Sequence, residues 1–169
     1  MAERKNQEII DDQSLKELNL DAKVTVKNIA GWSVGFTRKD GLIGDISIPA
    51  NGSVRLSRTE IIAQIQSGNR LFTGLDGMGS HATLFIDDAP TRIEVEFESA
   101  DGKKKQNIFS DSKIKALFAM TPSKFQDEFK KAIRTRAEKH AVIGAIKRLR
   151  INDFQKLRFV EKYTGYKIQ

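Results

Sequence analysis

The hydrophobic pattern of the chain changes period once, near residues 102–107, and this change constrains the fold more than any other feature. Before it, short runs alternate between apolar and polar side chains, as half-buried β-strands do. After it, apolar side chains recur at intervals of three and four, which is typical of amphipathic helices. Strands followed by helices predict an α+β protein rather than a βαβ series.

The first part, residues 23–109, is divided by dipeptides that favour tight turns. These Asp-Gly and Asn-Gly pairs occupy positions 40–41, 51–52, 76–77 and 101–102. The clearest alternation lies in residues 91–97, where Ile93, Val95 and Phe97 would face a core and the intervening glutamates would face water. We therefore predict an N-terminal β-rich module, either a sandwich or barrel-like.

One helix is expected inside this β-rich module. Ser57 and Glu60 have the spacing of a capping box, in which each side chain bonds the backbone N–H of the other residue. Ile61, Ile62 and Ile65 then follow on one helical face. The module is thus predicted to be strands interrupted by a single helix of about ten residues.

The last part, residues 110–169, is predicted to be a small helical bundle, and residues 1–22 a flexible N-terminal arm. The expected helix caps are Ser110 or Asp111, Thr121 before Pro122, Thr135 with Glu138, and Asn152. In the final helix Phe154, Leu157 and Val160 are expected to face inward. Gly165 would end that helix.

Charge divides the chain at the same place as the hydrophobic period. Residues 1–99 carry 11 basic and 15 acidic side chains, a net charge of −4, whereas residues 100–169 carry 18 basic and 7 acidic side chains, a net charge of +11. Positive charge at this density attracts polyanions, because binding releases their condensed counterions. The residues predicted to contact a nucleic acid or an acidic partner are Lys103, Lys104, Lys105, Lys130, Lys131, Arg134, Arg136, Lys147, Arg148, Arg150 and Arg158.

Three interpretations of the basic part stay open. Phe159, Tyr163 and Tyr166 could stack on the bases of a nucleic acid, and residues 135–150 could be the recognition helix of a helix-turn-helix motif. The cations at the end of that helix are placed to interact favourably with the helix dipole. A recognition helix instead contacts bases with side chains of its first turns, which argues against this interpretation. The charge could equally face an acidic protein, or serve solubility alone.

A glycine-rich loop, residues 74–81, is the other candidate for contact with a ligand or partner. The residues predicted to contact the ligand or partner are Gly77, Gly79 and His81 of the loop, together with the nearby Arg70. A plain interstrand loop is the alternative, since no Gly-Lys-Ser/Thr sequence follows and the next residues have a strand pattern. Ser80 and His81 would point to opposite sides of a strand, which argues against a catalytic triad.

The composition makes enzymatic chemistry unexpected. The chain has no cysteine and two histidines, His81 and His140, which lie in different halves. Disulfides, thiolate catalysis and cysteine zinc sites are therefore excluded, and we expect no cofactor, no metal and no enzyme activity. No apolar stretch approaches the length of a membrane span, and residues 1–8 lack the apolar core of a signal peptide, so we expect neither a membrane partner nor export by that route.

Two segments carry a resemblance to a known class of proteins. Residues 48–58 read IPANGSVRLSR, expected as a strand leading into a capped helix, and residues 68–86 read GNRLFTGLDGMGSHATLFI, expected as a strand with a long glycine loop. Together they resemble small, mostly uncharacterised proteins of tailed bacteriophages and prophages.

The resemblance implies a non-enzymatic structural or accessory protein of a phage particle, associated with its capsid, portal or tail. Such a protein would act through contacts with other virion proteins or with copies of itself, in the virion or the host cytoplasm. The alternative is a cytoplasmic nucleic-acid-binding regulator that uses the basic helices.

Overall fold

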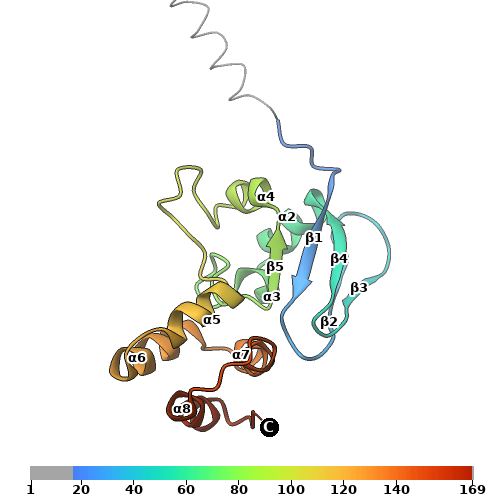
Figure 1. Ribbon diagram of the computed structural model, residues 1–169. Coiled ribbons are helices and arrows are strands. Elements are labelled where there is room, and N and C mark those ends of the chain that lie inside the picture. Colours follow the sequence, from blue (N-terminus) through green and yellow to red (C-terminus); the bar gives the residue numbers. More distant parts are fainter. Residues whose placement is uncertain (1–16, 169) are drawn as a thin grey trace, which may run out of the picture.

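The computed structural model describes residues 17–168, which form an α+β fold with five strands and seven helices (Figure 1). In chain order the elements are β1 (Lys23–Asn28), β2 (Val34–Thr37), β3 (Asp45–Ile48), β4 (Ser53–Ser57), α2 (Arg58–Gln66), α3 (Arg70–Thr73), β5 (Leu84–Asp87), α4 (Ala89–Glu94), α5 (Asp111–Phe118), α6 (Pro122–Ala132), α7 (Arg136–Arg148) and α8 (Phe154–Thr164). The predicted order of a β-rich part and then a helical part is confirmed. No helix in this part of the chain is long and apolar enough to cross a membrane.

Most of the predicted N-terminal arm, residues 1–16, lies outside the described residues. The end of that segment is attached to the fold. The backbone N–H groups of Arg58 and Thr59 donate to the carbonyl oxygens of Ala22 (3.1 Å) and Leu20 (3.0 Å). Residues 20–22 therefore satisfy the free donors at the start of α2, and the ordered module begins before Lys23.

The strands form two small antiparallel sheets. One has the order β4-β1-β5, and the other is the hairpin β2-β3. Alternation is clear in β1, where Val24 and Val26 are buried opposite Leu56 and Ile86. Neither sheet closes on itself within residues 17–168, so the predicted sandwich or barrel-like module is not supported.

Helix α2 begins where its cap predicts, but half of the capping box is missing. The Ser57 hydroxyl accepts from the Glu60 N–H at 3.1 Å. The Glu60 carboxylate, fully buried, instead accepts from the Lys39 N–H with both oxygens at 3.0 Å. It therefore fastens the β2-β3 hairpin to α2, a long-range contact that local spacing does not reveal.

Two predicted strands of the β-rich module are helices. Asn69 accepts from the Leu71 N–H and starts α3, where a strand was expected. Residues 91–97 fall on α4 and the turn after it, because Asp88 caps Thr91 and Pro90 stands in the first turn. Phe97 reaches the core, as predicted, but from that turn. Residues 103–109, at the end of the predicted β-rich module, form no strand.

The four predicted helices after residue 110 are all present. Ser110 caps α5, and Thr135 with Glu138 makes a complete capping box at α7. Asp153, not Asn152, caps α8, and Gly165 ends it in a left-handed conformation. The α8 core side is centred on Val160, so Phe154 is 70% exposed and its predicted inward orientation is wrong.

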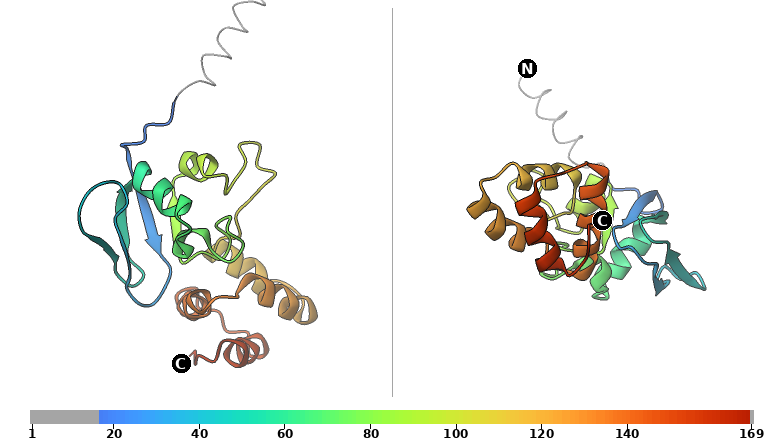
Figure 2. Two further views of the ribbon diagram at one scale, coloured as in Figure 1. Left: turned by 180° about the vertical axis from the view of Figure 1, so that it is seen from behind. Right: turned by 60° about the horizontal axis from the view of Figure 1, so that its bottom comes forward.

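The two parts have separate hydrophobic cores. One contains Val26, Ile48 and Phe72 in the β-rich module, and the other contains Phe129, Ile146 and neighbouring helical residues. Helix α7 lies where the modules meet, with α6 and α8 beyond it (Figures 1 and 2). The His140 ring covers Gly31 of the β-rich module and contacts Trp32 edge-on at 6.0 Å.

Candidate nucleic-acid interface

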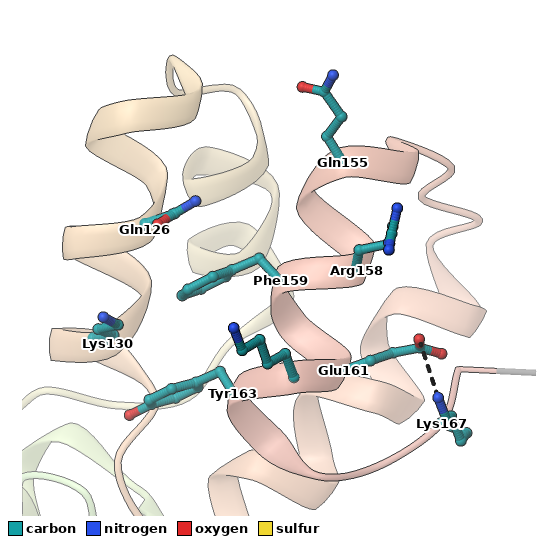
Figure 3. A pocket seen from close by; sticks show the side chains of 9 residues that line it. Gln126, Lys130, Gln155, Arg158, Phe159, Glu161, Tyr163 and Lys167 are labelled. Carbon is teal, nitrogen blue, oxygen red and sulfur yellow. Dashed lines mark ion pairs between the residues drawn. The ribbon is translucent and has the colours of Figure 1, made fainter.

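An open groove of about 940 Å³ lies between α6 and α8 (Figure 3). Its lining residues are Gln126, Lys130, Gln155, Arg158, Phe159, Glu161, Lys162, Tyr163 and Lys167. Four of these are cations and one is an acid. We call this feature the α6–α8 groove.

Helix packing fixes which side chains line the groove. On α6, Phe125 and Phe129 are buried at a spacing of four and leave Lys130 at the rim. On α8, Val160 faces the core, while Phe159 and Tyr163 lie one turn apart and extend toward α6 (Figure 3). The groove is thus a product of two amphipathic helices whose apolar stripes meet below it.

Phe159 and Tyr163 form an aromatic wall. Their rings are parallel within 6°, with centroids 5.9 Å apart, and both contact Phe129 edge-on. The Tyr163 hydroxyl donates to the Ile133 carbonyl at 2.7 Å. Burial raises the pKa of the Tyr163 phenol, partly offset by the charge of Arg134. The ring is therefore held neutral and in a fixed orientation.

The groove cations are poorly neutralised. Among residues 17–168, Lys130, Arg158 and Lys162 have no acidic partner within salt-bridge distance. Lys167 approaches Glu161 at 3.8 Å, an exposed pair of small energetic value. Lys130 lies 5.8 Å from the Phe159 ring centroid, a cation–π distance. Unpaired cations beside aromatic faces are suited to an anion that also carries flat rings.

The structure brings together only some of the predicted basic residues. Lys130 and Arg158 line the groove. The positive charge of the exposed Arg134 lowers the pKa of the Tyr163 phenol, which lines the groove as well. Lys131 pairs with Glu128, and Arg148 with Asp111 at 2.6 Å. The other predicted residues lie outside the groove: Lys103, Lys104 and Lys105 in the exposed loop before α5, Arg136 over Trp32, Lys147 in the last turn of α7, and Arg150 after it.

Lys162 was not among the predicted contact residues, although it lines the groove. It follows Arg158 by four residues and Phe159 by three, so a helical projection of α8 would have placed it beside both. That spacing was the available signal.

The packing of α7 argues against the helix-turn-helix interpretation of residues 135–150, which stays a prediction. Val142, Ile143 and Ile146 of α7 are buried in the helical core, while Glu138 and His140 face the β-rich module. A recognition helix must present a free face along its first turns to enter a major groove. In the first turns of α7, Glu138 and His140 are engaged with the β-rich module, whereas the exposed Gly144, Lys147 and Arg148 lie toward its end.

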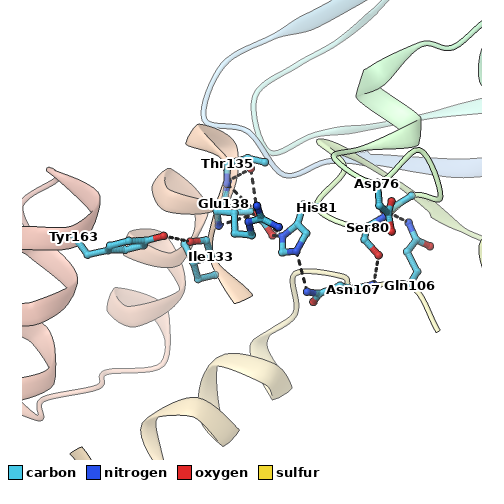
Figure 4. Close-up of polar contacts among 11 residues, drawn as sticks. Asp76, Ser80, His81, Gln106, Asn107, Ile133, Thr135, Glu138 and Tyr163 are labelled. Atoms are coloured by element: carbon cyan, nitrogen blue, oxygen red, sulfur yellow. Dashed lines mark hydrogen bonds and ion pairs between the residues drawn. The ribbon is translucent and has the colours of Figure 1, made fainter. Parts of the chain in front are cut away.

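The glycine-rich loop reaches the junction of the two modules through His81. His81 is 8% exposed, and its Nδ1 lies 2.9 Å from a Glu138 carboxylate oxygen (Figure 4). Its Nε2 lies 3.0 Å from the Asn107 side-chain nitrogen. Gly79 is also buried, against Phe97. Of the predicted loop contacts, Arg70 and Gly77 are exposed, and neither lines the α6–α8 groove.

Two further candidates for chemistry are Asp76 of the glycine-rich loop and clusters of metal-ligating side chains. Asp76 accepts from the backbone N–H groups of Met78 and Ser80, which makes it a loop residue. No group of three His, Asp or Glu side chains in residues 17–168 could hold a metal ion.

Comparisons with protein-family models, curated proteins and solved structures found no match to this chain. A functional interpretation therefore rests on the geometry of the protein itself.

Proposed function

We propose that this protein binds nucleic acid through the α6–α8 groove. The observation that carries the proposal is the set of three unpaired cations, Lys130, Arg158 and Lys162, beside the parallel rings of Phe159 and Tyr163. Phosphates would replace the missing acidic partners, and the gain in free energy comes largely from released counterions. Binding of this kind needs no catalytic step, and the absence of enzyme activity stays a prediction.

An acidic protein surface is a weaker candidate for the same groove. Acidic side chains would satisfy the cations, but they give no role to the two rings that form the groove wall. Nucleic acid uses both features, since every base presents a π-face and every nucleotide a phosphate.

Direct binding tests the proposal. The groove variant Lys130→Gln/Arg158→Gln/Lys162→Gln removes three positive charges, and the control Lys103→Gln/Lys104→Gln/Lys105→Gln removes the same charge from the exposed loop before α5. We expect fluorescence anisotropy at low salt to show a loss of about tenfold or more for the groove variant and little loss for the control. Equal losses would mean that overall charge, not the groove, governs binding. No binding by the native protein would refute the proposal.

A role in a phage particle remains a separate prediction from the resemblance of residues 48–58 and 68–86. Light scattering of the protein alone and sedimentation with purified particles address it. A strict monomer that never sediments with particles would contradict it without affecting the groove.

A further inference from the structure

The aromatic ring of Phe154 lies outside the hydrophobic core of the helical module. It is 70% exposed at the first position of α8, and the next residue, Gln155, lines the groove. The Arg158 guanidinium lies 5.7 Å from its ring centroid. An apolar ring exposed to water at the surface is unfavourable, and its contact with one cation stabilises the folded protein only slightly.

Phe154 continues a regular pattern along α8. Phe154, Arg158 and Lys162 follow at intervals of four, and Phe159 and Tyr163 form a parallel row beside them. Each ring also has a cation at cation–π distance: Arg158 at Phe154, Lys130 at Phe159 and Lys139 at Tyr163, the last at 4.8 Å. Rings and cations therefore lie side by side along α8.

We infer that the nucleic acid bound by the α6–α8 groove is single-stranded, with a base stacked on Phe154 and phosphates on Arg158 and Lys162. This inference rests on the proposed function and adds the class of ligand. The bases of a duplex are stacked and paired inside it, so they offer no face to a side chain, whereas unpaired bases do. Because stacking ignores base identity, we expect little dependence on sequence.

The placement of the helices favours this choice over a duplex. The rings of Phe159 and Tyr163 on α8 are turned toward α6, where they form one wall of the groove (Figure 3). Rings in this position can stack only on a base whose face is open, which a duplex does not offer. A narrow row of rings and cations instead suits one strand lying along α8.

The test compares Phe154→Leu with Phe85→Leu in the full chain. Phe85 is a matched control, since its ring also lies under an arginine, Arg92 at 5.1 Å, but in the β-rich module. The probes are labelled oligo(dT) of about 15 nucleotides and a duplex of the same length. Thermal unfolding of both variants confirms that each remains folded.

We expect the native protein to bind oligo(dT) at least about tenfold more tightly than the duplex at equal salt. Phe154→Leu should weaken oligo(dT) binding roughly fivefold and leave duplex binding unchanged, while Phe85→Leu changes neither. Equal binding of both probes, or an unchanged affinity in Phe154→Leu, would overturn the single-strand inference while salt-sensitive groove binding stands. Absence of binding to either probe would overturn the proposed function as well.

Discussion

Helices α7 and α8 are both basic, but they lie in different surroundings. Helix α7 packs between the two modules, where Glu138 bonds His81 and Arg136 lies over Trp32. Helix α8 lies at the outside, where Arg158 and Lys162 border an open groove and have no acidic partner among the described residues. Charge density along a sequence therefore does not locate a binding surface. What distinguishes the surface is whether the cations are left unpaired beside something a ligand can use.

The largest expected effect concerns Glu138, at the centre of the junction. Its carboxylate is 1% exposed and accepts from His81, from the Arg134 and Thr135 N–H groups, and from the Thr135 hydroxyl. Glu138→Ala leaves these donors unsatisfied, so we expect a loss of about 3 kcal/mol in the free energy of unfolding, measured with urea.

The control for that change is Glu128→Ala on α6, whose carboxylate, within residues 17–168, makes only the exposed pair with Lys131. It should change stability by less than about 0.5 kcal/mol. Similar losses of unfolding free energy in the two variants would show that the buried Glu138 contributes no more to stability than the exposed Glu128.

A smaller effect is expected from close packing at the junction. A Cβ atom added to Gly31 would lie 2.0 Å from the His140 ring, which contacts Trp32 and Tyr166 edge-on. Gly31→Ala should therefore destabilise the protein by about 2 kcal/mol in thermal or urea unfolding.

Gly144, on the exposed part of α7, is the matched control. A Cβ atom there meets nothing within 4 Å. Gly144→Ala should stabilise the protein by about 0.5–1 kcal/mol, because alanine favours the helix. If both substitutions stabilise, the modules are not packed closely at Gly31.

The smallest expected effect concerns an acid-sensitive contact of the β-rich module, made by Asp88. Burial alone would raise the pKa of the Asp88 carboxyl, but hydrogen bonds from Thr91 and Arg58 outweigh it and hold the pKa below its ordinary value of 3.8. A depressed pKa stabilises the folded state at pH values above the unfolded pKa, and this stabilisation is lost as pH falls through the folded value.

We therefore expect Asp88→Asn to cost about 1 kcal/mol at neutral pH and progressively less below about pH 4, by urea unfolding at a series of pH values. A difference that persists unchanged in acid would show that the Asp88 charge is not what joins α2 to α4.

The helical module could be predicted from sequence because its signals are local. Ser110, Thr135 and Gly165 start or end helices through bonds within a few residues, and those predictions are confirmed. The strand predicted for residues 91–97 was wrong, because alternation over so short a run also fits one helical turn followed by a loop. The Asp88 cap and Pro90 in the first turn favour the helix.

The candidate site could be predicted only in part. Lys130 and Arg158 were predicted as contact residues from their charge. Whether each has an acidic partner depends on which carboxylates the fold brings near. The bond between His81 and Glu138 spans 57 residues, and Glu138 already had a local explanation in the capping box. Long-range contacts of this kind decide which cations remain free, so sequence pattern alone could not find the groove.

The salt dependence of binding tests the central claim most directly. For oligo(dT) at salt concentrations from about 50 to 200 mM, the logarithm of the binding constant should fall linearly with the logarithm of salt concentration. The variant Lys130→Gln/Arg158→Gln/Lys162→Gln should reduce the magnitude of this slope by about 2, because each lost phosphate contact contributes about 0.7. The control Lys103→Gln/Lys104→Gln/Lys105→Gln should keep the native slope. Equal slopes in the two variants would contradict the assignment of binding to the α6–α8 groove.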